Sequence, residues 1–153
     1  MTNRISRDEV GLLIARAWSL RATCPRRQVG CLLTDADGYP LGTGYNGPAS
    51  GELHCIDVPC PGANAKPGTG LDMCIAIHAE ANALLQCTDV RRIDTCYVTA
   101  SPCTFCVRLL LNTSCRRIVF ANEYPHAEAR LRWVNYGREW TYLPYPNNGS
   151  YHA

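Results

Sequence analysis

The sequence predicts an α/β protein with three layers, an α/β/α sandwich around a central mixed five-stranded sheet. Helical and strand patterns alternate after residue 78, as expected for a partly parallel sheet with helices on both faces. Before that point, two strand-like runs flank the turn sequence Asp35-Ala36-Asp37-Gly38, so they should pair as an antiparallel hairpin. The chain has 153 residues and 46% apolar content, enough for one core, and we expect a single domain over residues 1–153.

The first part of the chain should form a helix followed by the hairpin. Ser6 and Glu9 fit a capping box, and apolar residues then recur at helical spacing to about Leu20. Apolar runs over residues 28–35 and 40–47 predict a buried strand and the strand that returns beside it.

Residues 47–73 are rich in Gly and Pro and predict a long loop, which in a compact domain is usually functional or tied down. The remaining elements are expected in this order: helix 78–87, strand 94–100, helix 103–111, strand 116–121, helix 126–136, strand 139–143 and a flexible tail over 144–153.

Charge and composition exclude several classes of protein. The net charge is only +2, from 15 basic and 13 acidic residues, without the basic stripe of a nucleic-acid groove. The sequence has no apolar run of about 20 residues, so we expect no membrane span. The N-terminus lacks a signal-peptide pattern, which indicates a cytoplasmic protein. There, 10 cysteines point to metal binding or catalysis rather than to disulfides.

Two of these cysteines, Cys103 and Cys106, follow Ser101 and Pro102 with a two-residue spacing. That spacing lets both thiolates meet one metal ion at the start of a helix, where the helix dipole favours their anionic form. Taken alone, the motif fits a metal site, a redox pair or a coincidence.

His78 and Glu80, at the start of another predicted helix, favour the metal site among these alternatives. If the strands near residues 75 and 99 are neighbours, the two following helices begin at the same sheet edge. His78 then joins Cys103 and Cys106 around one zinc ion, and three protein ligands with an open fourth position are typical of catalytic zinc. Glu80 is placed to exchange protons with a water there. Taken one at a time, His78 could be an ordinary surface or core histidine, and Glu80 could simply complement the helix dipole.

The pattern His-x-Glu followed by Pro-Cys-x-x-Cys is the signature of zinc nucleobase deaminases. The segments "IHAEANALL", "SPCTFCVRLLL" and "RRIVFANEY" together resemble the cytidine deaminase-like superfamily. "VGCLLTDADGYPLGTGYNGPASG" resembles, more narrowly, the deoxycytidylate (dCMP) deaminase family, which includes phage enzymes. The resemblance extends from about Cys24 to Leu143. It implies a cytidine deaminase-like fold and zinc-dependent hydrolytic deamination of dCMP to dUMP and ammonia, feeding dTMP synthesis.

The resemblance also implies roles for residues around the zinc site. Glu80 would move protons to ring nitrogen N3 and to the departing amine. The other substrate contacts are expected from Ala79 and Ser101 on the base edge, Asn46 on the sugar hydroxyl, Tyr124 on the nucleotide, and Arg26 and Arg27 on the phosphate. Either arginine could instead be a solvated charge, and Asn46 with Gly47 could be a plain turn.

A second, structural zinc site is implied by relatives that use cysteines matching Cys24 and Cys55. Cys60 and Cys74 are the natural further ligands here, with His54 as a competitor, and four thiolates would make a closed site that orders the long loop. The remaining cysteines are expected to be small buried hydrophobic residues: Cys31, Cys87, Cys96 and Cys115.

The resemblance leaves substrate and regulation open. The same chemistry could act on dCTP, on a free nucleoside or on a tRNA adenosine, although the low net charge argues against tRNA. A zinc-stabilised binding module without turnover is the alternative from another class. Many relatives are homohexamers that dCTP activates and dTTP inhibits, with Mg²⁺ at the nucleotide effector.

Overall fold

The structure is a computed structural model that describes residues 4–66, 69–70 and 73–145. Its helices are α1 (Arg7–Ser19), α2 (Ala79–Gln86), α3 (Thr104–Leu111) and α4 (Ala127–Asn135). Its strands are β1 (Gly30–Thr34), β2 (Pro40–Tyr45), β3 (Thr95–Ala100), β4 (Arg117–Asn122) and β5 (Glu139–Tyr142). Among the described residues, no helix has both the length and the apolarity needed to cross a bilayer. Most of the predicted tail, residues 146–153, lies outside the described residues.

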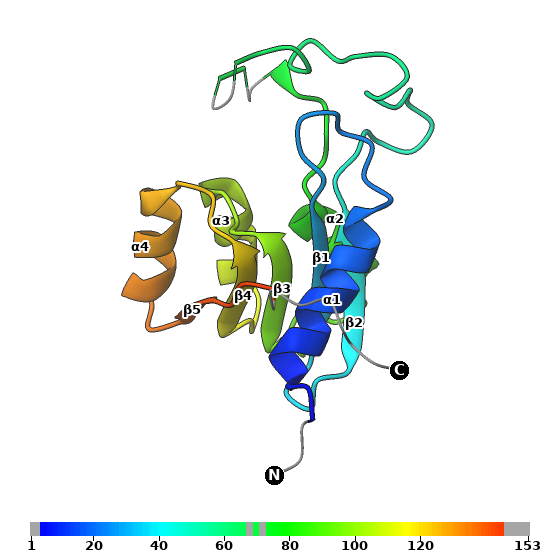
Figure 1. Cartoon of the computed structure of the whole chain (residues 1–153). Helices are drawn as coiled ribbons and strands as arrows, with labels where there is room; N and C mark the ends of the chain where they lie inside the picture. The colour runs from blue at the N-terminus through cyan, green and yellow to red at the C-terminus, as the bar shows by residue number, and fades with distance from the viewer. Residues whose placement is uncertain (1–3, 67–68, 71–72, 146–153) are drawn as a thin grey trace.

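The five strands form one mixed sheet in the order β2-β1-β3-β4-β5 (Figure 1). Strand β1 pairs antiparallel with both β2 and β3, so the predicted hairpin is present. Strands β3, β4 and β5 run parallel, with α3 and α4 as their connections. A mixed five-stranded sheet was predicted from the sequence, and it is confirmed.

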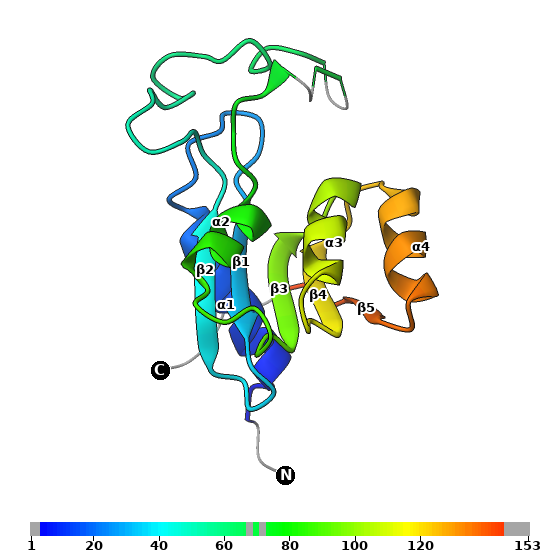
Figure 2. The ribbon, with the colours of Figure 1, turned by 180° about the vertical axis from the view of Figure 1, so that it is seen from behind.

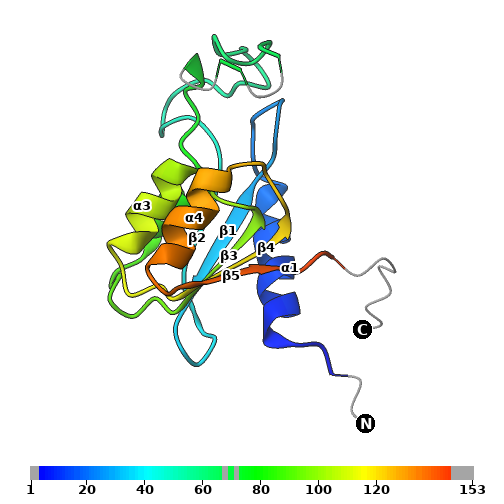
Figure 3. The same cartoon turned by 90° about the vertical axis from the view of Figure 1, so that its left-hand side faces the viewer.

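Helices cover both faces of this sheet. Helix α1 lies on one face, while α2, α3 and α4 lie on the other, as Figures 2 and 3 show from two sides. On the α1 face, Leu12 and Ala15 pack against Leu32, Tyr97 and Val119 of the strands. The core on the opposite face is larger and is centred on buried residues that include Ala83, Val98, Val107, Ile118 and Trp133. The three-layer arrangement is therefore confirmed.

Two glycines of β2 allow α2 to lie unusually close to the sheet. A β-carbon built on Gly42 would stand 2.4 Å from the carbonyl oxygen of Ala83. A β-carbon on Gly44 would stand 2.3 Å from the carbonyl oxygen of Ala79. Both contacts are with helix backbone, which cannot rotate out of the way, so these glycines fix the position at which α2 begins.

The strand near residue 75 that the zinc-site prediction assumed does not form. The segment before α2 forms only an isolated antiparallel bridge between Gly47 and Ile77. Their backbones exchange two hydrogen bonds, from Gly47 N to Ile77 O at 3.2 Å and from Ile77 N to Gly47 O at 2.8 Å. Strand β3 already has β1 on one edge and β4 on the other, so no edge is left for a further strand. The start of α2 is instead held beside the end of β2.

The long loop between β2 and α2 lies beyond the end of the sheet where β2, β3 and β4 finish (Figure 1). Arg26 ties it down by donating hydrogen bonds to three of its carbonyl oxygens: those of Gly62, Lys66 and Thr69, each at 3.1 Å. A guanidinium group suits this task because its donors point in several fixed directions.

Candidate metal and active site

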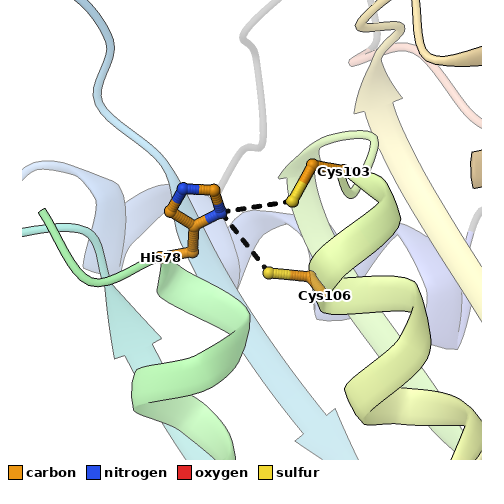
Figure 4. A group of neighbouring side chains, drawn as sticks. All are labelled: His78, Cys103 and Cys106. Carbon is orange, nitrogen blue, oxygen red and sulfur yellow. Dashed lines mark hydrogen bonds between the residues drawn. The ribbon is translucent and has the colours of Figure 1, made fainter. Parts of the chain in front are cut away.

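Three potential metal ligands meet where α2 and α3 begin (Figure 4). His78 and Cys103 are the N-cap residues of α2 and α3, and Cys106 lies in the first turn of α3. The Nδ1 atom of His78 faces both sulfurs, at 3.4 Å from each. Within the described residues, this is the only group of three His, Cys or acidic side chains whose ligand atoms all lie within 4.8 Å of one another.

The donor set and its spacing fit zinc. A tetrahedral zinc ion with bonds of about 2.1 Å to nitrogen and 2.3 Å to sulfur would hold those atoms roughly 3.6 Å apart. The observed nitrogen–sulfur distances of 3.4 Å are close to this value. Imidazole and thiolate are also the ligand types that zinc prefers. The three side chains can therefore hold one zinc ion and leave its fourth position free.

Interactions among the three ligands favour the thiolate form of one of them, Cys103. Hydrogen bonding by Cys106 is the main influence that lowers the pKa of Cys103 to about 3, against the opposing effect of burial, and His78 adds to the lowering. The same interaction, reinforced by burial, raises the pKa of Cys106. The neighbouring Cys103 raises the pKa of His78. Cys103 is therefore the ligand whose thiolate form its surroundings favour most.

Glu80 lies in the first turn of α2 and is only 4% exposed to solvent. Burial raises the pKa of this carboxyl, and its interaction with His78 only partly offsets that effect. A buried carboxyl next to two thiols and an imidazole is costly in a purely structural position. A raised pKa suits a group that takes up and releases protons near neutral pH.

Arg27 and Tyr124 lie together near this carboxyl. The guanidinium carbon of Arg27 stands 4.4 Å from the centroid of the Tyr124 ring. Burial lowers the pKa of Arg27, while Tyr124 and Glu80 act in the opposite direction. On the other flank, the imidazole of His126 at the start of α4 lies 4.7 Å, centroid to centroid, from the Tyr124 ring. Of the two predicted phosphate ligands, Arg27 is therefore the one whose charge interacts with that of Glu80.

Arg26, in contrast, is used by the long loop. Its three hydrogen bonds to loop carbonyl oxygens account for both terminal nitrogens of the guanidinium. No motif predicts this role, because the partners are backbone groups 36 to 43 residues away.

The other predicted substrate contacts lie near the same sheet end and are partly engaged with the protein itself. Asn46 accepts a hydrogen bond from Val29 N and donates one to Arg27 O, both at 2.8 Å. The Ser101 hydroxyl is bonded to the backbone of Tyr124. Ala79 is fully buried at the start of α2. Roles for Asn46, Ser101 and Ala79 in substrate binding stay predictions.

The four cysteines of the predicted second metal site lie near one another in and beside the long loop. Cys60 interacts with both Cys55 and Cys74, and Cys74 is close enough to Cys24 for their charges to interact. Burial raises the pKa of Cys55 and of Cys74. His54, the competing ligand, is exposed, and its Nδ1 lies 3.0 Å from the Thr23 hydroxyl. This set is less compact than the His78 group.

The remaining cysteines belong to the hydrophobic core, as predicted. Cys31, Cys96 and Cys115 are fully buried in the core beneath α2 and α3, and Cys87 is partly buried at its margin. The sulfurs of Cys31 and Cys96 are 3.6 Å apart.

Comparison with known proteins agrees with this geometry. Residues 5–122 match the family described as the cytidine and deoxycytidylate deaminase zinc-binding region. The chain belongs to that family. Zinc is therefore its metal, and the chain is a hydrolytic deaminase.

Individual relatives of this chain are named as deaminases of deoxycytidylate (dCMP). A deoxycytidylate deaminase of Mycobacterium phage D29 is 39% identical over 122 residues, which cover 76% of this chain and 94% of the phage protein. The deoxycytidylate deaminase of Saccharomyces cerevisiae is 30% identical over 79% of this chain, but only 39% of the yeast protein is matched. The solved structure of dCMP deaminase from cyanophage S-TIM5, in complex with dCMP and dUMP, shares the fold. Its TM-score is 0.70 at 24% identity, covering 94% of this chain and 99% of that one.

Proposed function

We propose that the chain deaminates dCMP to dUMP and ammonia with one zinc ion held by His78, Cys103 and Cys106. The observation that carries the proposal is the meeting of these three ligands beside the buried carboxylic acid Glu80. The phage relative named deoxycytidylate deaminase, similar over almost its whole length, supports dCMP as the substrate.

The residues of this chain would divide the chemistry as follows. When bound, zinc acts as a Lewis acid and brings the pKa of a ligated water towards about 7. Glu80 moves the two protons of the attacking water in turn: the first goes to N3 of the pyrimidine and stays there, and the second goes to the leaving amine at C4. Ammonia leaves with the second proton, and the oxygen of the water remains on C4 as the carbonyl group of dUMP. Burial of Glu80 supports this shuttle, because it places the carboxyl pKa nearer to the working pH.

Recognition of the nucleotide would come from residues around the same sheet end. Arg27 is our candidate for the 5′-phosphate, supported by its proximity to Glu80 and by the absence of an ion-pair partner within the described residues. Asn46 would face the sugar hydroxyl, and the main chain at Ala79 and Ser101 would hold the base edge. Arg26 is the weaker candidate for phosphate, because its terminal nitrogens already bind the loop.

Ammonia release from a panel of substrates tests the proposal. We expect the highest kcat/KM with dCMP, and lower values with deoxycytidine, dCTP and an RNA hairpin that presents adenosine. Best activity on deoxycytidine would overturn the assignment, since that substrate has no phosphate for Arg27. Best activity on dCTP would keep the chemistry and change the substrate.

A second zinc ion at Cys24, Cys55, Cys60 and Cys74 is a further part of the proposal. The mutual proximity of these thiols supports it, as does the need to order a long loop of low secondary structure. We expect about two zinc ions per purified chain and about one in Cys60→Ser. The ion that remains in this variant should be the one held by His78, Cys103 and Cys106. One zinc ion in both proteins would remove the second site.

Family resemblance alone supports the regulatory part: a homohexamer, activation by dCTP, inhibition by dTTP and Mg²⁺ at the effector. Light scattering of the purified protein and initial rates with each effector test these points directly. A monomer with unchanged rates would remove them without affecting the deaminase assignment.

A further inference from the structure

The hydroxyl of Ser101 is committed to one neighbouring segment of backbone. It donates a hydrogen bond to the carbonyl oxygen of Tyr124 at 3.0 Å and accepts one from the Tyr124 N–H at 2.6 Å. Ser101 N also donates to the carbonyl oxygen of Asn122 at 2.9 Å. Ser101 is only 5% exposed, so this pair of hydrogen bonds is shielded from competing water. Ser101, which follows β3, therefore fixes the end of β4 and Tyr124, two residues beyond it, by main-chain and side-chain bonds together.

Tyr124 passes this restraint to Arg27. Its ring lies under the Arg27 guanidinium, 4.4 Å from centroid to carbon, which is within the range of a cation–π interaction. Arg27 has no ion pair, and its side chain no hydrogen-bond acceptor, in the part of the chain that the structure describes. The ring of Tyr124 is thus the contact that holds this long, otherwise mobile side chain in one place.

We propose that Ser101 is a positioning residue for nucleotide recognition: its hydroxyl holds Tyr124, and Tyr124 holds Arg27 ready for the substrate phosphate. The inference rests on the proposed function, in which Arg27 binds that phosphate. It assigns the Ser101 side chain an indirect role, distinct from any contact of its main chain with the base. Ser101 then determines how strongly the enzyme prefers a nucleotide over the matching nucleoside.

The test compares dCMP with deoxycytidine, which differ only by the phosphate. In Ser101→Ala we expect the ratio of kcat/KM for dCMP to that for deoxycytidine to fall about tenfold, the usual size of one lost ionic hydrogen bond. The loss with dCMP should come mainly from a higher KM, and the loss with deoxycytidine should be smaller. Ser101→Thr keeps a hydroxyl and should restore the ratio. The product pair, dUMP and deoxyuridine, should show the same selective loss in direct calorimetric binding.

Ser114 offers a matched control. Its hydroxyl also bonds to loop backbone, donating to Val90 O at 3.2 Å and to Ile93 O at 2.6 Å, at the opposite end of β4. Ser114→Ala removes the same kind of bond but should leave the substrate ratio unchanged. Equal ratio changes in both serine variants would show a general effect of destabilisation and overturn the proposal.

Tyr124→Leu keeps the proposal falsifiable if Ser101→Ala does not fold. This variant removes the ring and should lower the ratio at least as much as Ser101→Ala. A folded Tyr124→Leu enzyme with the wild-type ratio overturns the proposal, as does a folded Ser101→Ala enzyme that loses both substrates equally. A wild-type enzyme that does not prefer dCMP to deoxycytidine is a different result, because it contradicts the proposed function itself.

Discussion

Gly44 in β2 lies so close to α2 that a β-carbon built on it would stand 2.3 Å from the carbonyl oxygen of Ala79. Ala79 follows the ligand His78 and precedes Glu80, so this contact sets the position of both functional side chains. The absence of a side chain at Gly44 is therefore part of the active-site architecture.

Gly44→Ala should displace the start of α2. The added methyl group meets backbone atoms, so we expect a loss of about 1–3 kcal/mol in the free energy of unfolding, as is usual for overpacking. Urea denaturation measures this loss, and competition with a chromogenic chelator should show weaker zinc retention.

Gly47→Ala is the matched control for this variant. A β-carbon at Gly47 would meet only the Thr23 hydroxyl, at 3.4 Å, which is an ordinary contact distance. Gly47→Ala should therefore retain zinc as the wild-type protein does. Equal zinc affinity in Gly44→Ala would show that α2 does not need its close contact with β2.

Glu80→Gln should separate metal binding from turnover. The amide has nearly the shape of the carboxyl but cannot shuttle protons, so we expect kcat to fall by roughly 10²–10⁴-fold. The zinc content should not change, because His78, Cys103 and Cys106 supply the ligands. Glu128→Gln, which alters an exposed carboxylate on α4, is the control.

Normal turnover by Glu80→Gln would exclude Glu80 as the proton carrier. Loss of zinc from that variant would instead make Glu80 a ligand. A binding module without turnover would need the three ligands but not this carboxylate, so the same pair of measurements also tests that alternative.

Arg26→Ala should loosen the long loop while leaving the chemistry intact. The variant removes three hydrogen bonds, to the carbonyl oxygens of Gly62, Lys66 and Thr69. We expect faster proteolytic cleavage within residues 60–70, and faster loss of a loop-bound zinc ion on chelation. Arg91→Ala, at an exposed site, is the control for the lost charge.

Kinetics distinguish the two neighbouring arginines. Arg27→Ala should raise KM for dCMP and not for deoxycytidine, whereas Arg26→Ala should treat the two substrates alike. A selective loss of dCMP in Arg26→Ala would make Arg26 a phosphate ligand, contrary to its position in the structure.

Much of the fold follows from local patterns in the sequence. The capping box of α1 is present, with Ser6 and Glu9 bonded reciprocally, and the hairpin turn lies between β1 and β2. Strand ends were less predictable, because they depend on pairing with distant segments. The predicted first strand began at residue 28, but β1 begins at Gly30, because Val29 bonds to the backbone N–H and the side chain of Asn46, which lies just beyond the end of β2. The strand assumed near residue 75 does not form, because the sheet has no free edge beside β3.

The site divides in a similar way. His78, Glu80, Cys103 and Cys106 stand at short spacings in two motifs, so local sequence is enough to select them. Arg26 and Arg27 are adjacent and chemically identical, and only the three-dimensional position of the loop carbonyl groups and of Tyr124 separates their roles. The hydroxyl of Ser101 and the closeness of Gly44 to α2 also arise from long-range packing, which no motif records.

The stability of the fold should depend on pH through Asp8, which joins α1 to the sheet. Its carboxylate accepts hydrogen bonds from Arg117 at 2.7 and 3.2 Å and from the Tyr97 hydroxyl at 2.8 Å. Burial raises the pKa of Asp8, but these bonds outweigh it and place the pKa below its ordinary value of 3.8. A lowered carboxyl pKa contributes stability that is complete above 3.8 and is lost as the pH falls through the folded-state value.

Asp8→Asn should therefore be less stable than wild type at pH 7, by about 1–3 kcal/mol for a lost charged hydrogen-bond network. The difference should shrink as the pH falls below about 4, because protonation then removes the same charge from the wild-type protein. Urea unfolding of both proteins at several pH values measures the difference, and effects of acid on the zinc site cancel in it. Asp37→Asn, in the β1–β2 turn, should show a small difference at every pH. A wild-type advantage over Asp8→Asn that persists unchanged at pH 2 would show that the Asp8 charge does not hold α1 in place.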